Sequence, residues 1–193
     1  PALVHLHKHE DGFVRTHSAL ALARMPASPP AEVQTVVDGL KSTDPGLRSF
    51  AAAVLSEMGP QAGDALSTLA ESLNDRDGYV RLHAAEVLIR YDRWSYQALD
   101  ALLGGLKDKD ENIRWLATYS LAELAPESQE TVDALLKATH DPVIKVKVGA
   151  VYALGEIGPF AKSACTELRK LADTATSQEL QSAILYALQQ IEQ

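Results

Sequence analysis

The sequence predicts an all-α protein, an α-solenoid built from six two-helix repeats. The first observation is a basic residue that returns every 33 residues, at Arg15, Arg48, Arg81, Arg114 and Lys147. The second is a pair of apolar patterns with helical spacing inside each interval, separated by an acidic turn. A constant period of this size indicates stacked helix pairs that contact mainly their neighbours, rather than one globular core.

The period divides the chain into one repeat domain over 1–193, with repeats at about 1–26, 27–59, 60–92, 93–125, 126–158 and 159–193. In the sixth repeat Gln181 takes the basic position one residue late. We expect the extra residue in the turn at 172–179, where an insertion costs little. Because the first residue is Pro1 rather than Met, we expect the chain to be a piece of a longer protein.

Each repeat is expected to bury one face of both helices. In the first helices this face consists of Val33, Val36, Val37 and Leu40, then Leu66, Leu69, Ala70 and Leu73, then Leu99, Leu102, Leu103 and Leu106, then Val132, Leu135, Leu136 and Thr139. In two of the second helices it consists of Val80, Ala84, Val87, Leu88 and Tyr91, and of Ile113, Ala117, Ser120, Leu121 and Leu124.

An acid stands four residues before the basic position at Asp11, Asp44, Asp77 and Asp110. Such an Asp can accept the free N–H groups of a helix's first turn, so it predicts the start of each second helix. Three repeats add a second acid two residues earlier, at Asp75, Asp108 and Asp141.

The strings DRDGYVRLHAAEVL (75–88) and DKDENIRWLATYSL (108–121) resemble HEAT repeats, particularly the short type of bilin lyases and artificial helical-repeat binders. The resemblance covers essentially the whole chain and implies a right-handed superhelix whose second helices line the concave side. It also implies a structural ladder between adjacent repeats, formed by Asp11, Arg15, Asp44, Arg48, Asp77, Arg81, Asp110, Arg114 and Lys147. Lys147 and Gln181 depart from the Arg column, so the ladder is expected to be irregular in the last two repeats.

Composition argues against several partners. The formal charge is −8, with acids in both halves, whereas a phosphate backbone needs clustered Lys and Arg, so nucleic acid is not expected. No apolar run approaches the roughly 18 residues that span a bilayer, so membrane insertion is not expected either. Cys165, the single cysteine, is expected to be a small buried residue, and it leaves the compartment open.

Histidines crowd the start of the chain, at His5, His7, His9 and His17. Two His four residues apart on a helix can share a metal, but no carboxylate or Cys completes a set, so no metal or other cofactor is expected. HEAT-like di-iron hydroxylases repeat a His-Glu dipeptide across several repeats, and this chain has it once, at His9-Glu10. No Gly-rich phosphate loop or Ser-His-Asp set is present, so no catalytic residue is expected.

Another set of side chains is expected to project from the second helices away from the core. Its members are Phe50, Leu82, His83, Glu86, Trp115, Leu116, Tyr119, Tyr152 and Tyr186, bordered by Glu57, Glu123 and Glu156, with Arg24 and Arg90 on the other half. Exposed aromatic side chains on a rigid surface act as anchors in protein interfaces. The alternative is that the tyrosines pack on one another as ordinary contacts between repeats.

The leading hypothesis is therefore a non-catalytic scaffold that binds a protein or peptide on its concave face. Two alternatives stay open at this point. One is an enzyme or enzyme subunit of the bilin lyase or nucleic-acid glycosylase kind. The other is self-association of the chain.

Overall fold

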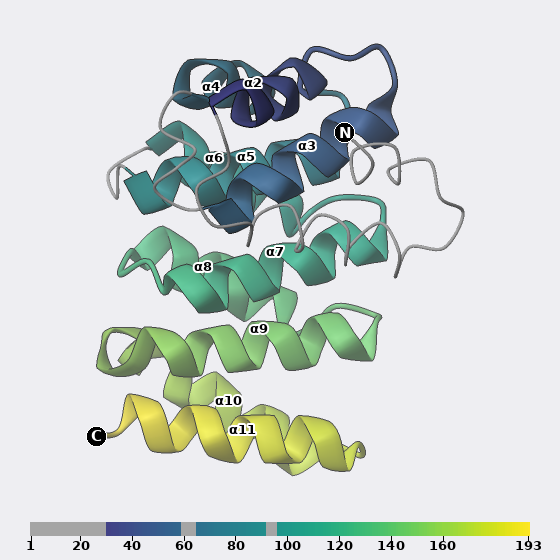
Figure 1. Cartoon of the computed structure of the whole chain (residues 1–193). Helices are drawn as coiled ribbons and strands as arrows, with labels where there is room; N and C mark the ends of the chain where they lie inside the picture. The colour runs from purple at the N-terminus through teal and green to yellow at the C-terminus, as the bar shows by residue number, and fades with distance from the viewer. Residues whose placement is uncertain (1–29, 59–64, 92–95) are drawn as a thin grey trace. The chain divides into compact units, whose positions relative to one another are not determined.

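The computed structural model describes residues 30–58, 65–91 and 96–193, and within these ranges all regular structure is helical, as predicted (Figure 1). Shorter first helices alternate with second helices of 14 residues. The elements are α2 (Pro30–Gly39), α3 (Pro45–Met58), α4 (Leu66–Ser72), α5 (Gly78–Tyr91), α6 (Tyr96–Gly105), α7 (Glu111–Leu124), α8 (Gln129–Ala138), α9 (Ile144–Ile157), the 3-10 helix η3 (Gly158–Ala164), α10 (Cys165–Thr174) and α11 (Gln178–Ile191). The expectations for Asp11, Arg15, Arg24 and the four early histidines lie outside the described residues.

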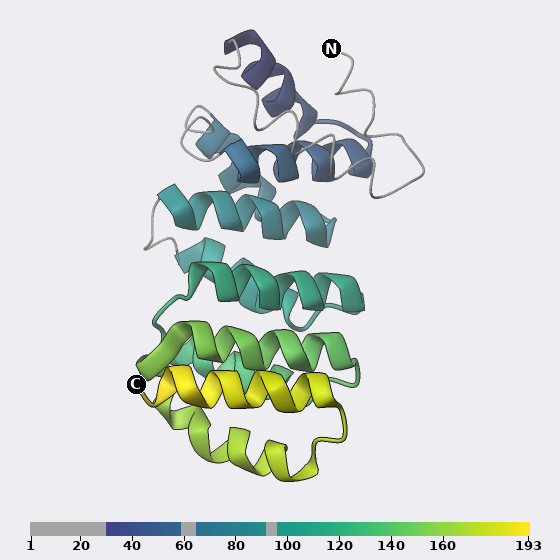
Figure 2. The ribbon, with the colours of Figure 1, turned by 60° about the horizontal axis from the view of Figure 1, so that its bottom comes forward.

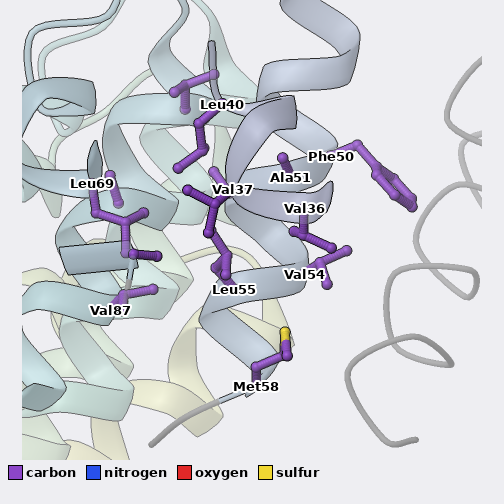
Figure 3. Close-up of a cluster of buried hydrophobic side chains, with 14 residues drawn as sticks. Val36, Val37, Leu40, Phe50, Ala51, Val54, Leu55, Met58, Leu69 and Val87 are labelled. Carbon is purple, nitrogen blue, oxygen red and sulfur yellow. The ribbon is translucent and has the colours of Figure 1, made fainter. Parts of the chain in front are cut away.

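Contacts between Cα atoms divide the chain into two compact bodies, Pro1–Ala101 and Leu102–Gln193, with the boundary inside α6. They are called the N-terminal and C-terminal body below. In the N-terminal body α2 packs on α3, and both α3 and α4 pack on α5. Its core includes Val37, Leu55, Leu69 and Val87, which approach one another from different helices (Figure 3). One repeat domain over 1–193 stays a prediction.

In the C-terminal body the three second helices pack in succession, α7 on α9 and α9 on α11. The yellow α11 lies alongside the green α9 in Figure 2. On the other side, α8 packs against α9 and α10 packs against α11. The second helices therefore form one layer and the first helices another, which is the arrangement of a helical solenoid.

The predicted apolar faces are largely confirmed. Val80, Ala84 and Val87 are buried in α5, and Ala117 and Leu121 are buried in α7. Cys165 is also buried.

Two positions of these faces are exposed rather than buried, namely Tyr91, at 37%, and Ala70. Several others are only half-buried: Leu66, Leu73, Leu88, Leu99, Leu124 and Leu136. Tyr91 is the last residue of α5. At the end of a helix the neighbouring elements no longer enclose the side chain on every side, so the expectation that Tyr91 is buried is wrong.

The acids four residues before the Arg cap α3, α5 and α7, as predicted. Oδ1 of Asp110 accepts the N–H of Asn112 at 2.8 Å, Oδ1 of Asp77 accepts that of Tyr79 at 2.9 Å, and Oδ1 of Asp44 accepts that of Gly46 at 2.9 Å. Each of these bonds satisfies an N–H group that the first turn of a helix leaves without an intrahelical partner.

The carboxylates that bind the Arg column come from the second acids, which corrects the expected ladder. Nε and Nη2 of Arg48 donate to both oxygens of Asp75 at 2.7 and 2.9 Å. Arg114 binds Asp141 in the same way, at 2.7 and 3.1 Å. In these pairs the predicted link between neighbouring repeats is present, but Asp44 and Asp110 serve as caps.

The same guanidinium groups also donate hydrogen bonds to the turn that precedes their own helix. Nη1 of Arg48 donates to the carbonyl oxygen of Ser42 at 3.0 Å, and Nη1 of Arg114 donates to that of Asp108 at 2.9 Å. Gln181 keeps this bond, since its Nε2 donates to the carbonyl oxygen of Ala175 at 2.7 Å. Six residues before Gln181, Ala175 also occupies the position that Asp141 has relative to Lys147, so the last repeat brings no carboxylate there.

Two glycines of α9 allow the second helices to approach closely. A Cβ added at Gly149 would lie 2.2 Å from Oγ1 of Thr118 on α7, and one added at Gly155 would lie 2.9 Å from Cα of Ala187 on α11. Real Cβ atoms essentially never lie this close to another heavy atom, so a side chain at either position would force its neighbour on the next helix to shift. These contacts fix the spacing of the layer that carries the aromatic residues.

Candidate binding surface

Four aromatic side chains lie on the second helices of the C-terminal body, and we call them the aromatic surface: Trp115 and Tyr119 of α7, Tyr152 of α9 and Tyr186 of α11. Trp115 is 43% exposed, Tyr119 50% and Tyr152 46%, while Tyr186 is half-buried. The predicted exposure is therefore confirmed for Trp115, Tyr119 and Tyr152, whereas Tyr186 is less open than predicted.

The rings associate in two pairs. The centroids of Trp115 and Tyr119 lie 6.3 Å apart, with ring planes tilted by 33°. The rings of Tyr152 and Tyr186 stack at 5.0 Å with planes 12° apart, which is one of the arrangements that aromatic pairs prefer. The expected contact between tyrosines of neighbouring repeats is thus present at α9 and α11, yet it leaves Tyr152 largely open to solvent.

Two carboxylates complete this surface. The hydroxyl of Tyr119 donates to Oε1 of Glu123 at 3.0 Å, and the hydroxyl of Tyr186 donates to Oε1 of Glu156 on the neighbouring helix. The second hydrogen bond is the main cause that raises the pKa of Tyr186 well above its ordinary value. Tyr186 therefore stays protonated and acts as a donor that orients the carboxylate of Glu156.

Several residues expected on the same surface are buried instead. Phe50 is 7% exposed, Leu82 1% and Glu86 5%, so the expectation that these side chains project from the core is wrong. Phe50 is part of the core of the N-terminal body. Because a second helix is flanked by helices on both sides, only a narrow stripe of it stays open, and flanking positions close when a neighbour carries a large side chain. His83 and Leu116 are half-buried.

A polar network accounts for the burial of Glu86. Its Oε2 accepts the hydroxyl hydrogen of Ser56 on α3 at 2.8 Å and lies 3.0 Å from Nδ1 of His83. Nη1 of Arg90 donates to the carbonyl oxygen of Ser56 at 2.9 Å. A buried carboxylate with such partners joins α3 to α5 and is a structural feature. The position of Glu86 within Ala-Ala-Glu-Val, among apolar neighbours, was the sequence signal for it.

A recess beside the Arg48 turn is polar and lined by Thr43, Glu71, Asn74 and Asp75. Its central charges already bind each other, because Arg48 and Asp75 form the bidentate pair described above. Across the described ranges there is also no group of three or more His, Cys, Asp or Glu side chains placed to hold a metal ion. The aromatic surface is accordingly the candidate site.

Stacked helix pairs with an open second-helix face define a helical-repeat scaffold. A family model described as HEAT repeats matches residues 1–89, 66–143 and 99–189. The chain therefore belongs to the HEAT-repeat family.

Three solved structures of similar fold are an engineered protein and two designed repeat proteins, each with a TM-score of 0.61. An engineered protein of the Northeast Structural Genomics Consortium is 24% identical, covering 99% of this chain and 95% of its own. The designed armadillo repeat protein YIII(Dq)4CqI is 18% identical, covering 99% of each chain. The designed armadillo repeat protein YIII(Dq.V1)4CPAF, in complex with the peptide (KR)4, is also 18% identical, covering 99% and 98%. At these identities the likeness shows the fold alone.

Among curated proteins no sequence matches this chain. The helices of the described ranges include none with the length and apolar character that crossing a membrane requires.

Proposed function

We propose that this protein is a non-catalytic scaffold that binds an extended segment of another protein across the aromatic surface. The observation that carries the proposal is the exposure of three large rings, Trp115, Tyr119 and Tyr152, on helices whose opposite faces are closely packed. Solvent-facing helix positions normally hold charged or small polar side chains.

Rigid aromatic side chains are well suited to this role. Each buries a large area on contact and loses little conformational freedom, because only two side-chain torsions become fixed. The close packing of α9 against both neighbours keeps the rings on a firm base, so little ordering is required when a partner binds.

The layer of parallel second helices suits an extended partner. A chain laid across α7, α9 and α11 meets equivalent positions of three repeats in turn. A designed armadillo repeat protein of similar fold is in complex with a peptide, which supports this mode of binding by analogy of fold.

The test begins with a displayed library of random 12-residue peptides selected on the full 193-residue chain. We expect Trp115→Ala combined with Tyr152→Ala to lower the affinity for the selected peptides by at least about 30-fold, or about 2 kcal/mol, because both anchors are lost. The melting temperature should fall by no more than about 4 °C, since the Tyr152–Tyr186 stack contributes about 1 kcal/mol.

The matched control is Tyr96→Ala, which removes an exposed tyrosine from α6 and should leave the affinity within about twofold. If the double variant melts much earlier, the two rings belong to the core and the surface is wrongly assigned. Selected peptides that bind the double variant as well as the original chain would place the binding site elsewhere.

A further inference from the structure

We propose that the segment bound by the aromatic surface is cationic and presents Lys or Arg side chains to Glu123 and Glu156. The inference rests on the proposed function and specifies the chemistry of the partner. Three features of the C-terminal body support it: the placement of the two carboxylates, the distribution of charge along the helices, and the exposed rings.

The carboxylates stand where a helix ordinarily favours the opposite charge. Glu123 and Glu156 are each the second-last residue of their helix, α7 and α9, and the carboxyl end of a helix carries a partial negative charge. Sequences usually place Lys or Arg there, but the last turns of α7, α9 and α11 contain none. The negative potential at this edge of the layer therefore has no basic residue from these turns to offset it.

The charge of the layer is uneven along the helix axes. The residues 115–124, 148–157 and 182–191 contain no Lys or Arg, and Glu123 and Glu156 are the only charged residues among them. The cations of α7 and α9 lie nearer the amino ends. Arg114 binds Asp141, and Nζ of Lys145 lies 3.1 Å from Oε1 of Glu111 and donates to Asn112 at 2.8 Å. The charge of Lys147 acts on Asp141.

The rings add a second attraction for the same kind of group. An ammonium or guanidinium group over the face of a Trp or Tyr ring gains about 0.5 to 2 kcal/mol. The indole ring of Trp115 attracts such a cation more strongly than a tyrosine ring does. The hydroxyl of Tyr186 already orients Glu156, and a carboxylate has about four lone-pair sites, so Glu156 keeps capacity to accept from a partner. An acidic segment would instead meet like charges.

The repeat spacing predicts the spacing of the basic residues. Packed helices lie about 8 to 10 Å apart, so Glu123 and Glu156, at equivalent positions of successive repeats, should be separated by a similar distance. A polyproline-like extended chain advances about 9 Å in three residues and returns its side chains to the same side. Basic residues three positions apart would therefore meet the two carboxylates in turn.

The test uses three fluorescent nine-residue peptides with Arg, Gln or Glu at every third position and Gly and Ser between them, titrated into the full chain by anisotropy. We expect the Arg peptide to bind at least about tenfold tighter than the Gln peptide, and the Glu peptide to bind weakest. Raising the NaCl concentration from about 50 to about 200 mM should weaken the binding of the Arg peptide, because salt screens exposed charges.

Paired variants assign the effect to residues. Glu123→Gln combined with Glu156→Gln should lower the affinity for the Arg peptide at least about tenfold and make that affinity less dependent on salt. The affinity for the Gln peptide should stay within about twofold of its original value. Glu130→Gln with Asp133→Asn changes the net charge equally on exposed positions of α8 and should leave the Arg peptide within about twofold.

Several results would overturn the inference. Binding of the Gln or Glu peptide as tight as that of the Arg peptide, with loss in the Trp115→Ala and Tyr152→Ala variant, would keep the proposed function and reject a cationic partner. If both pairs of charge variants lower the affinity for the Arg peptide equally, the peptide is attracted by the net charge of the protein rather than by Glu123 and Glu156. If none of the three peptides binds, the inference fails, while the library-derived peptides still decide the proposed function.

Discussion

At the scale of single residues, the carboxylate of Asp141 has two tasks. Its oxygens accept both N–H groups of the Arg114 fork, and Oδ1 also accepts the N–H of Val143 at 2.9 Å, which closes the turn before α9. Burial disfavours the charged form, but these hydrogen bonds and the charges of Arg114 and Lys147 outweigh it and lower the pKa of Asp141 below its usual value. For Asp75 the bond from Arg48 is the main cause of the same lowering of its pKa.

A lowered pKa in the folded state makes the contribution of Asp141 dependent on pH. The stabilisation is present above the pKa that an Asp has in the unfolded chain, near 4. It is lost as the pH falls through the lower pKa that Asp141 has in the folded protein. We expect Asp141→Asn to lower the free energy of unfolding by about 1 to 3 kcal/mol at pH 7, because the charged hydrogen bonds are lost. The gap to the original chain should narrow below about pH 4.

Urea midpoints at pH 7, 5, 4 and 3 measure this gap. Asp133→Asn, at an exposed position of α8, is the control and should change the midpoint little at any pH. A gap for Asp141→Asn that is the same at pH 3 and pH 7 would contradict the role assigned to its charge.

At the scale of the helices, the spacing of α9 and α11 depends on the hydrogen that Gly155 has in place of a side chain. Alanine usually stabilises a helix by about 1 kcal/mol relative to glycine. At Gly155 the new Cβ would press on the backbone of Ala187, which cannot rotate aside. We expect Gly155→Ala to destabilise the protein by about 1 to 3 kcal/mol, because overpacking outweighs the gain in helix propensity.

Gly104→Ala on α6 is the matched substitution, since a Cβ there would meet nothing within 4 Å. It should raise the stability by about 0.5 to 1 kcal/mol, as the helix propensity alone predicts. Thermal or urea unfolding of the two variants measures whether each substitution raises or lowers the stability of the protein. Stabilisation by Gly155→Ala would show that α9 and α11 can separate without loss.

The sequence predicted the helices better than it predicted their exposed stripes. Periodicity fixes which residues of one helix share a face, so Val80, Ala84 and Val87 were assigned correctly. Whether a flanking position stays open depends on the neighbouring helix, which the period does not describe. Leu82 and Trp115 occupy equivalent positions one residue after the Arg, yet the first is 1% exposed and the second 43%.

The ladder shows the same limit. The sequence has two acid columns, at Asp75 and Asp77 in one repeat, and both are close enough to an Arg to be candidates. The choice depends on the offset between adjacent repeats, which places the first column of one repeat opposite the Arg of the repeat before it. An offset of this kind is a property of packing between helices rather than of the spacing within one repeat.

At the scale of the whole molecule, two compact bodies and nearest-neighbour packing predict that damage stays local. In repeat proteins, stability is approximately a sum over repeats and their interfaces. Leu154→Ala empties a fully buried site in α9 and should cost about 2 to 5 kcal/mol. We expect amides of α7, α9 and α11 to lose protection from hydrogen exchange well before those of α3 and α5.

Hydrogen exchange followed by mass spectrometry, peptide by peptide, measures this order. The control is Leu55→Ala, which empties a site in α3 of the N-terminal body and should give the opposite order. Equal loss of protection along all described helices in both variants would mean that the chain unfolds as a single cooperative body.

The substitution of Ala175 for the ladder acid has a consequence for how the protein comes apart. The contact between α9 and α11 consists of Gly155 against Ala187, Tyr152 against Tyr186 and the hydrogen bond from the Tyr186 hydroxyl to Glu156, whereas the contact between α7 and α9 contains the Arg114–Asp141 ion pair. Dissolved salt screens the attraction between two opposite charges, but it acts much less on a hydrogen bond donated by a neutral hydroxyl. High salt should therefore weaken the contact between α7 and α9 more than the contact between α9 and α11.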